Sequence, residues 1–196
     1  MKKATTNAAT TITKKKSTGG CFIAGTKIIM SDMTYKNIED IVVGDTVIAY
    51  NELINSFEPR KVTKSYIHHN TPRVLDITLS NGLVLGITPG HPILTTEGWK
   101  SRDLENSIEE HGVIATWLNI GDIIIDYFGN VSIVNIQERD IPISYDTYNI
   151  EVEDCHTFLA DGVVVHNMKV EYDVGGMVQE DGQAYLHAKE SVLTPA

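Results

Sequence analysis

A cysteine directly after a glycine can react with its own backbone. In Gly20-Cys21 the thiol is placed to attack the carbonyl carbon of the preceding residue through a five-membered ring. The attack moves the acyl chain from nitrogen to sulfur, and no second molecule has to be bound. Gly20 leaves that carbonyl unhindered. A lone cysteine is more often a small buried apolar residue, so the pair by itself leaves both interpretations open.

A histidine after an apolar run can supply the proton that this acyl shift needs. In Thr88-Pro89-Gly90-His91 the histidine is suited to protonate the departing backbone nitrogen near neutral pH. Thr88, three residues earlier, can hydrogen-bond the same peptide. The pattern is short, and a turn with a solvent-exposed histidine is the alternative interpretation.

His166-Asn167 offers a second reaction. The side-chain nitrogen of Asn167 can attack its own main-chain carbonyl, which forms a succinimide and breaks the chain after the asparagine. An amide is a poor nucleophile and an amine is a poor leaving group, so the step needs histidines that polarise the carbonyl and protonate the amine. His166 and His156 are the candidates. The alternative is a turn-forming asparagine at the end of a strand.

These residues lie among short β-branched runs that are separated by turn signals. Asn81-Gly82 and Asp161-Gly162 each join two runs, as in tight hairpins, because these residue types accept positive φ. Only residues 101–111 have a helical pattern. The sequence therefore predicts an all-β domain. The expected strands cover residues 26–30, 46–50, 74–79, 83–88, 121–127, 131–136, 148–152 and 163–165.

One short pattern occurs twice. Residues 44–50 and 121–127 both read Gly-Asp-x-apolar-Ile-x-Tyr. A turn followed by a strand is common enough for chance to produce such a pair. The alternative is a duplication that gave the domain two related halves.

Composition limits the class of protein. The 196 residues are 42% hydrophobic and 21% charged, which is typical of a globular chain with one core. A net charge of −10 disfavours non-specific nucleic-acid binding, although residues 1–20 hold five lysines and no acidic residue. There is no run of 18 apolar residues and no apolar signal segment, and two cysteines cannot form a secreted disulfide framework. We expect a cytoplasmic monomer that binds neither nucleic acid nor membrane.

The order of these segments resembles that of the Hint domains, the self-processing modules of inteins and bacterial intein-like domains. The similar segments are residues 21–28 (CFIAGTKI), 86–92 (GITPGHP), 148–159 (YNIEVEDCHTFL) and 160–167 (ADGVVVHN). The resemblance implies a horseshoe-like β fold with pseudo-twofold halves, covering residues 21–167. It implies single-turnover autocatalysis without a cofactor, with the flanking residues 1–20 and 168–196 as the substrate. The catalytic residues it implies are Cys21, Thr88, His91, His156, His166 and Asn167.

Two positions depart from the family pattern. Residue 168 is Met168, where an intein has Cys, Ser or Thr. A thioether cannot accept the acyl group from Cys21, so splicing through a branched intermediate is blocked and two separate cleavages remain, as in type A bacterial intein-like domains. Ligation of the flanks stays open only through attack of the freed Met168 amine on the thioester. The second departure is Asn149, where many inteins have aspartate. Asparagine cannot act as a base, but it can hold geometry by hydrogen bonds.

The second cysteine, Cys155, adjoins His156 and allows a redox gate. A disulfide between Cys155 and Cys21 would silence the nucleophile, whereas the simpler interpretation is a buried strand cysteine. The histidines and cysteines do not have the spacing of a built zinc site, and we predict no metal.

Two other classes of function stay open. One is a degenerate Hint fold that is retained as a β scaffold or interaction module, which Met168 and Asn149 favour. The other is a cysteine peptidase that acts on other proteins. Residues 168–196 resemble the tail end of phage tape-measure proteins, so a phage tail protein is a candidate host.

Overall fold

The computed structural model describes residues 20–69, 71, 73–140 and 145–167. Within them the chain forms fifteen strands, one α-helix and one short 3-10 helix. In chain order the strands are β1 (Phe22–Ile23), β2 (Lys27–Ile29), β3 (Tyr35–Asn37), β4 (Thr46–Asn51), β5 (Ser56–His68), β6 (Arg73–Leu79), β7 (Val84–Ile87), β8 (Ile93–Thr95), β9 (Gly98–Ser101), β10 (Thr116–Trp117), β11 (Ile123–Ile124), β12 (Val131–Asp140), β13 (Thr147–Val152), β14 (Thr157–Ala160) and β15 (Val163–His166). The helices are η1 (Ile38–Asp40) and α1 (Leu104–His111).

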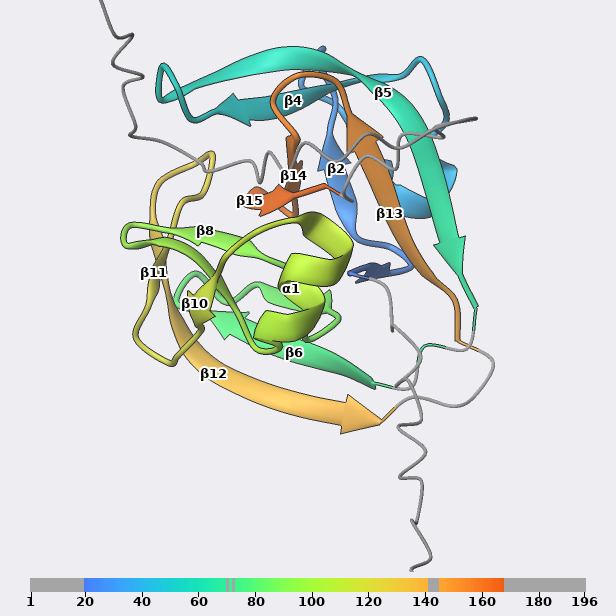
Figure 1. Cartoon of the computed structure of the whole chain (residues 1–196). Coiled ribbons are helices and arrows are strands. Elements are labelled where there is room, and N and C mark those ends of the chain that lie inside the picture. Colours follow the sequence, from blue (N-terminus) through green and yellow to red (C-terminus); the bar gives the residue numbers. More distant parts are fainter. Residues whose placement is uncertain (1–19, 70, 72, 141–144, 168–196) are drawn as a thin grey trace, which may run out of the picture.

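The strands join into one continuous sheet, which confirms the all-β prediction. Its order is β3-β2-β14-β15-β8-β11-β12-β6-β7-β1-β13-β5-β4, with β9 and β10 attached beside β8. The described pairs are antiparallel except for β9 with β10. Figure 1 shows β5 and β13 arching over one side of the molecule, and β6 and β12 crossing the opposite side. Strands β14 and β15 lie between them (Figure 1), so His166, the last residue of β15, lies in the middle of the fold.

The hydrophobic core sits inside this curved sheet. Every residue of β14 and β15 is buried, as expected for strands that are covered on both faces. Phe22 of β1 and Phe158 of β14 are fully buried, and their ring centroids lie 5.7 Å apart. By contrast, Val62 is the one residue of the long strand β5 that is buried. The core therefore holds β1 and β15 rigidly next to the residues that could react.

The repeated Gly-Asp pattern has the same local structure in both copies. Gly44 and Gly121 have φ angles of 95° and 94°. The carboxylate of each aspartate accepts a hydrogen bond from a main-chain nitrogen three residues earlier and pairs with a lysine 2.7 Å away. Its main-chain oxygen accepts a hydrogen bond from the following long strand, β5 or β12. The two copies are thus turns of the same local structure, as the duplication interpretation expects. The lysine partners are Lys36 for Asp45 and Lys100 for Asp122.

The expected strands and hairpins are present, with two differences. Asp161 and Gly162 both have positive φ and form the tight turn between β14 and β15. At Asn81-Gly82 only the glycine has positive φ, and the turn is closed instead by the Leu79–Leu83 backbone hydrogen bond. The expected strand 121–127 is reduced to the two residues of β11, because the residues after Ile124 leave β12 and bond to β15 and to the turn before it.

The helical pattern at 101–111 produces α1. The carboxylate of Asp103 accepts a hydrogen bond from the Asn106 nitrogen and caps the first turn, while Gly112 at φ 70° ends the helix after His111. A Cβ on Gly90 would lie 2.6 Å from the Cβ of Asn106, so α1 rests directly on the turn before His91. No helix in the described part of the chain has the length and apolarity to span a bilayer.

Candidate active site

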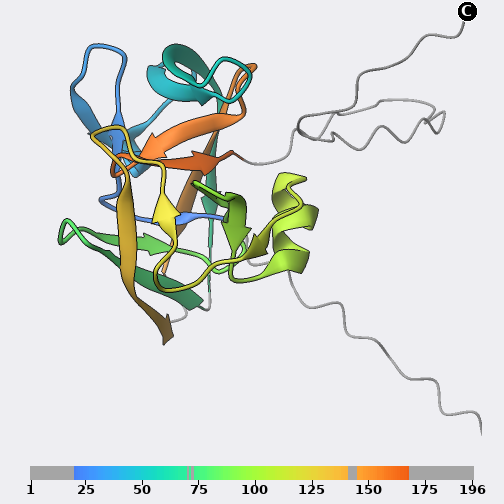
Figure 2. The same ribbon diagram turned by 90° about the vertical axis from the view of Figure 1, so that its left-hand side faces the viewer.

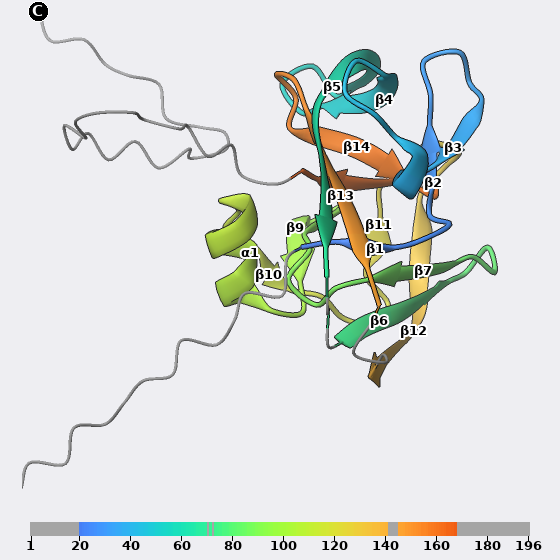
Figure 3. The same cartoon turned by 90° about the vertical axis from the view of Figure 1, so that its right-hand side faces the viewer.

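The residues on either side of the two junctions meet at one place in the fold. Strand β1 follows Cys21 and lies between β7 and β13, while β15 precedes Asn167 and lies between β14 and β8. Helix α1 stands at the edge of the molecule toward which β15 runs, as the two side views show (Figure 2, Figure 3). Its last residue, His111, contacts both Gly20 and Asn167. Two points 147 residues apart in sequence therefore share one site.

The Gly20–Cys21 peptide is held on both sides. The Cys21 nitrogen donates a hydrogen bond to the Thr88 hydroxyl at 2.8 Å, and the Thr88 nitrogen donates to the Cys21 carbonyl oxygen at 2.9 Å. The side-chain nitrogen of Asn149 donates to the carbonyl oxygen of Gly20. The side-chain oxygen of Asn149 accepts a hydrogen bond from the Ile150 nitrogen, and this bond fixes the orientation of the side-chain amide. The carbonyl that the thiol would attack is thus already polarised by a buried donor.

The thiol of Cys21 is fully buried. Burial raises its pKa well above the usual range, a hydrogen bond with the Thr147 side chain lowers it, and the nearby charge of Glu110 raises it. The thiol is therefore protonated at neutral pH. Any attack on Gly20 starts from the thiol and needs its proton to leave during the step.

His91 lies beside β1, the strand that follows Cys21. Its ring centroid is 4.4 Å from that of Phe22 and 4.5 Å from that of His111. Burial and the neighbouring His111 lower the pKa of His91 well below its usual value, so the ring is neutral at pH 7. The ring contacts the main chain of both Gly20 and His166, although neither contact has the geometry of a hydrogen bond. His91 thus stands between the two junctions.

The carbonyl oxygen of Asn167 accepts two imidazole hydrogen bonds. Nδ1 of His111 lies 2.7 Å from it and Nδ1 of His166 lies 2.9 Å from it. Because a carbonyl oxygen only accepts, each ring carries its proton on Nδ1. The Asn167 side-chain nitrogen donates to the Val152 oxygen at 3.1 Å, and the main-chain nitrogen donates to the His156 oxygen at 2.8 Å. The asparagine is buried, and its side-chain oxygen is the one polar atom of the residue without a hydrogen-bond partner among the described residues.

His156 supports this junction from the turn between β13 and β14. It adopts a left-handed backbone conformation, with φ 54°. Its ring stacks on that of His166, with the two ring centroids 6.4 Å apart. Trp99 contacts the same His166 ring edge-on at 5.3 Å. In the part of the chain that the structure describes, no group of three or more His, Cys, Asp or Glu side chains is arranged to hold a metal ion.

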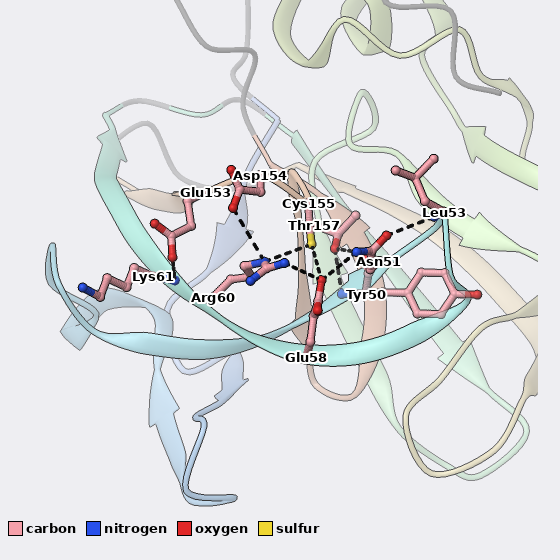
Figure 4. Close-up of polar contacts among 10 residues, drawn as sticks. All are labelled: Tyr50, Asn51, Leu53, Glu58, Arg60, Lys61, Glu153, Asp154, Cys155 and Thr157. Atoms are coloured by element: carbon pink, nitrogen blue, oxygen red, sulfur yellow. Dashed lines mark hydrogen bonds and ion pairs between the residues drawn. The ribbon is translucent and has the colours of Figure 1, made fainter.

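Cys155 belongs to a different cluster (Figure 4). Its sulfur donates to a Glu58 carboxylate oxygen at 3.2 Å and accepts from the Arg60 side chain at 3.4 Å. Cys155 and Cys21 are both free thiols, and Cys21 instead contacts Thr147 at the other end of β13. The expectation of a buried strand cysteine is wrong, because Cys155 is only partly buried and lies in a turn. The structure gives the redox gate no support.

Three residues at the site were not predicted from the sequence. His111 and Glu110 end the expected helix, and Thr147 directly precedes the expected strand 148–152, but none of them belongs to a recognisable motif. A Cβ on Gly20 would lie 1.6 Å from Nε2 of His111, so this ring presses directly on the residue before the nucleophile. Met168 and the flanks 1–19 and 168–196 lie outside the described residues.

Known proteins share this architecture. The solution structure of the bacterial intein-like domain from Clostridium thermocellum is 28% identical, with a TM-score of 0.62 over 75% of this chain and 98% of that one. The Ssp DnaB mini-intein variant M86 is 19% identical, with a TM-score of 0.63 over 79% and 97% of the two chains. A DnaB intein from Synechocystis sp. PCC 6803 is 21% identical, with a TM-score of 0.58 over 76% and 99%. No curated protein sequence matches the chain.

The fold defined by these likenesses is that of the Hint domains, which are autoprocessing modules. Residues 28–168 match the family described as the pretoxin Hint domain, and that match spans most of the chain. The protein belongs to this family.

Proposed function

We propose that the domain cleaves its own chain at both junctions. At the first, the sulfur of Cys21 attacks the Gly20 carbonyl carbon, the bond to the Cys21 nitrogen breaks, and the thiol proton ends on the freed amine. Water or a small thiol then opens the thioester and releases residues 1–20. At the second, the side-chain nitrogen of Asn167 attacks its own carbonyl carbon and loses a proton to the departing Met168 amine. The products are a succinimide at residue 167 and a free C-terminal flank.

One observation carries the proposal: both scissile carbonyl oxygens accept hydrogen bonds from buried side chains of the same site. Asn149 donates to Gly20, and imidazole nitrogen donates to Asn167. Donors aimed at the oxygen on which charge develops are what acyl-transfer chemistry requires. Thr88 accepts a hydrogen bond from the nitrogen that leaves in the first step, and His91 contacts the main chain of Gly20. His156 and His166 border the second junction.

The fate of the two flanks follows from Met168. Its thioether has no proton and cannot take the acyl group from Cys21, so cleavage at the two junctions proceeds without ligation through a branched intermediate. The substrate is the flanking polypeptide of the same chain.

An inactive scaffold is the alternative, and one observation favours it. The Cys21 thiol is protonated and fully buried, which slows any attack on Gly20. A retained but inactive fold would keep the donors without forming a thioester. Hydroxylamine separates the two, because it cleaves a thioester after Gly20 and leaves an amide intact.

The test is to express the whole chain and follow its mass over hours with and without hydroxylamine. The proposal predicts a 147-residue fragment that spans residues 21–167. Cys21→Ala should abolish the first cut alone, and Asn167→Ala the second cut alone. Cys155→Ala is the matched control, since it removes the other thiol, which lies in a separate cluster. If the full-length mass persists in every sample, the self-cleavage proposal is wrong.

A further inference from the structure

His111 lies outside every motif that placed the other residues, yet it touches both junctions. It ends α1, is 2% exposed, and packs its ring centroid 4.5 Å from that of His91. We propose that His111 is a catalytic residue of the Asn167 reaction and makes that reaction depend on the residue before Cys21. The inference rests on the proposed self-cleavage and adds a residue and a coupling to it.

The catalytic part follows from the two hydrogen bonds to the Asn167 oxygen. When the side-chain nitrogen of Asn167 attacks, negative charge develops on that oxygen. Nδ1–H of His111 at 2.7 Å and Nδ1–H of His166 at 2.9 Å lie at the distances of an oxyanion hole. Both rings donate without transferring the proton, so the proton lost by the attacking nitrogen still goes to the departing amine. Removal of one such donor from a buried site lowers a rate by about 10²–10³-fold.

The coupling follows from the other edge of the same ring. Nε2 of His111 has no hydrogen-bond partner among the described residues, and it faces Gly20. A Cβ at position 20 would overlap it at 1.6 Å. The ring has little room to retreat, since it is buried and the ring centroids of His91 and His166 lie 4.5 Å and 6.3 Å from its own. Any larger residue at position 20 therefore displaces the ring and breaks its hydrogen bond to Asn167.

The position of α1 explains why a side chain so far along the chain reaches both junctions. Gly112 ends the helix after His111, and the close packing of Asn106 on Gly90 fixes the helix against the turn that carries His91. His111 is therefore a rigid contact between the N-terminal flank and the C-terminal reaction.

The experiment measures cleavage after residue 167 in a Cys21→Ala chain, in which the first cut is blocked and Gly20 stays attached. His111→Leu removes the donor and should slow the release of the C-terminal flank by about 10²-fold. His111→Asn places an amide nitrogen near the position of Nδ1 and should restore part of the rate. Gly20→Ala should slow release comparably, and should add little to His111→Leu, since both act through one hydrogen bond. His69→Leu is the matched control, because that ring is exposed and pairs with Asp146.

Urea unfolding of each variant separates a catalytic effect from loss of the fold, and His111→Asn with Gly20→Ala carries the test if His111→Leu does not fold. Release within about twofold of the parent in folded His111→Leu would overturn the inference and leave the proposed function standing. Additive losses from His111→Leu and Gly20→Ala would overturn the coupling. A parent chain that never cleaves after residue 167 would overturn the proposed function, and the inference with it.

Discussion

Asn149 offers the sharpest test of the first junction. Its side-chain nitrogen donates to the Gly20 carbonyl oxygen, and the residue is 1% exposed, so water does not reach the oxygen in its place. Asn149→Ala removes a donor from the atom on which charge develops. The expected loss in the rate of the acyl shift is about 10²–10³-fold, or about 3–4 kcal/mol of transition-state stabilisation.

The assay follows release of residues 1–20 with hydroxylamine in an Asn167→Ala chain, so that only the first cut is measured. The control is cleavage after residue 167 in a Cys21→Ala chain, which Asn149→Ala should leave unchanged because Asn149 does not contact that carbonyl. Asn149→Asp adds a second measurement. Burial raises the pKa of a carboxyl group at this position, and the group donates only while it is protonated. Its rate should therefore fall as the pH rises through that pKa.

An unchanged rate of the first cut in folded Asn149→Ala would refute the reasoning. So would an equal loss at both junctions, because that result indicates damage to the fold instead of loss of one donor.

Two further predictions concern stability. Burial lowers the pKa of His111 to about 4 and that of His91 well below 6.5, so the unfolded chain binds more protons between these values. The contribution of these buried, neutral histidines to the free energy of unfolding is fully present above about pH 6.5 and decreases as the pH falls toward 4. For His111 the decrease amounts to about 3 kcal/mol. Urea midpoints across this range should fall less in His111→Asn, and an equal fall would contradict the assignment. Asp122→Asn should cost about 1.5–3 kcal/mol and Asp45→Asn about 1 kcal/mol or less, because the Lys100 side chain is 8% exposed and that of Lys36 is 33% exposed. Equal shifts in denaturation midpoints would show that burial does not distinguish the two pairs.

Hydrophobic pattern and turn chemistry were sufficient to predict eight of the fifteen described strands. The buried strands β6, β7, β13 and β15 coincide with apolar runs, and the paired Gly-Asp turns show their relationship in the sequence itself. Strand β5 was not predicted, although it is the longest. Most of its residues are charged or carry a hydroxyl group, and it contains Pro59, so no apolar run marks it. It is held by pairing with β4 and β13 instead of by burial of its own side chains.

The sequence predicted the site residues only where the reacting groups are close together in the chain. The reactions at Gly20-Cys21 and His166-Asn167 can be inferred from these residues alone, because each nucleophile and the carbonyl that it attacks are adjacent in the chain. His111, Glu110 and Thr147 reach the same place through tertiary packing alone. No short-range pattern distinguishes a histidine that ends a surface helix from one whose helix packs on a neighbouring turn.

The close fit between Gly20 and the end of α1 bears on the use of this domain as a tool. If a domain that begins at residue 21 were inserted into a foreign protein, the residue before Cys21 would be the one that the new host has there. Because a Cβ at that position overlaps an imidazole ring, a graft has to carry its own glycine to preserve the packing of both ends. The smallest portable unit begins one residue before the cysteine.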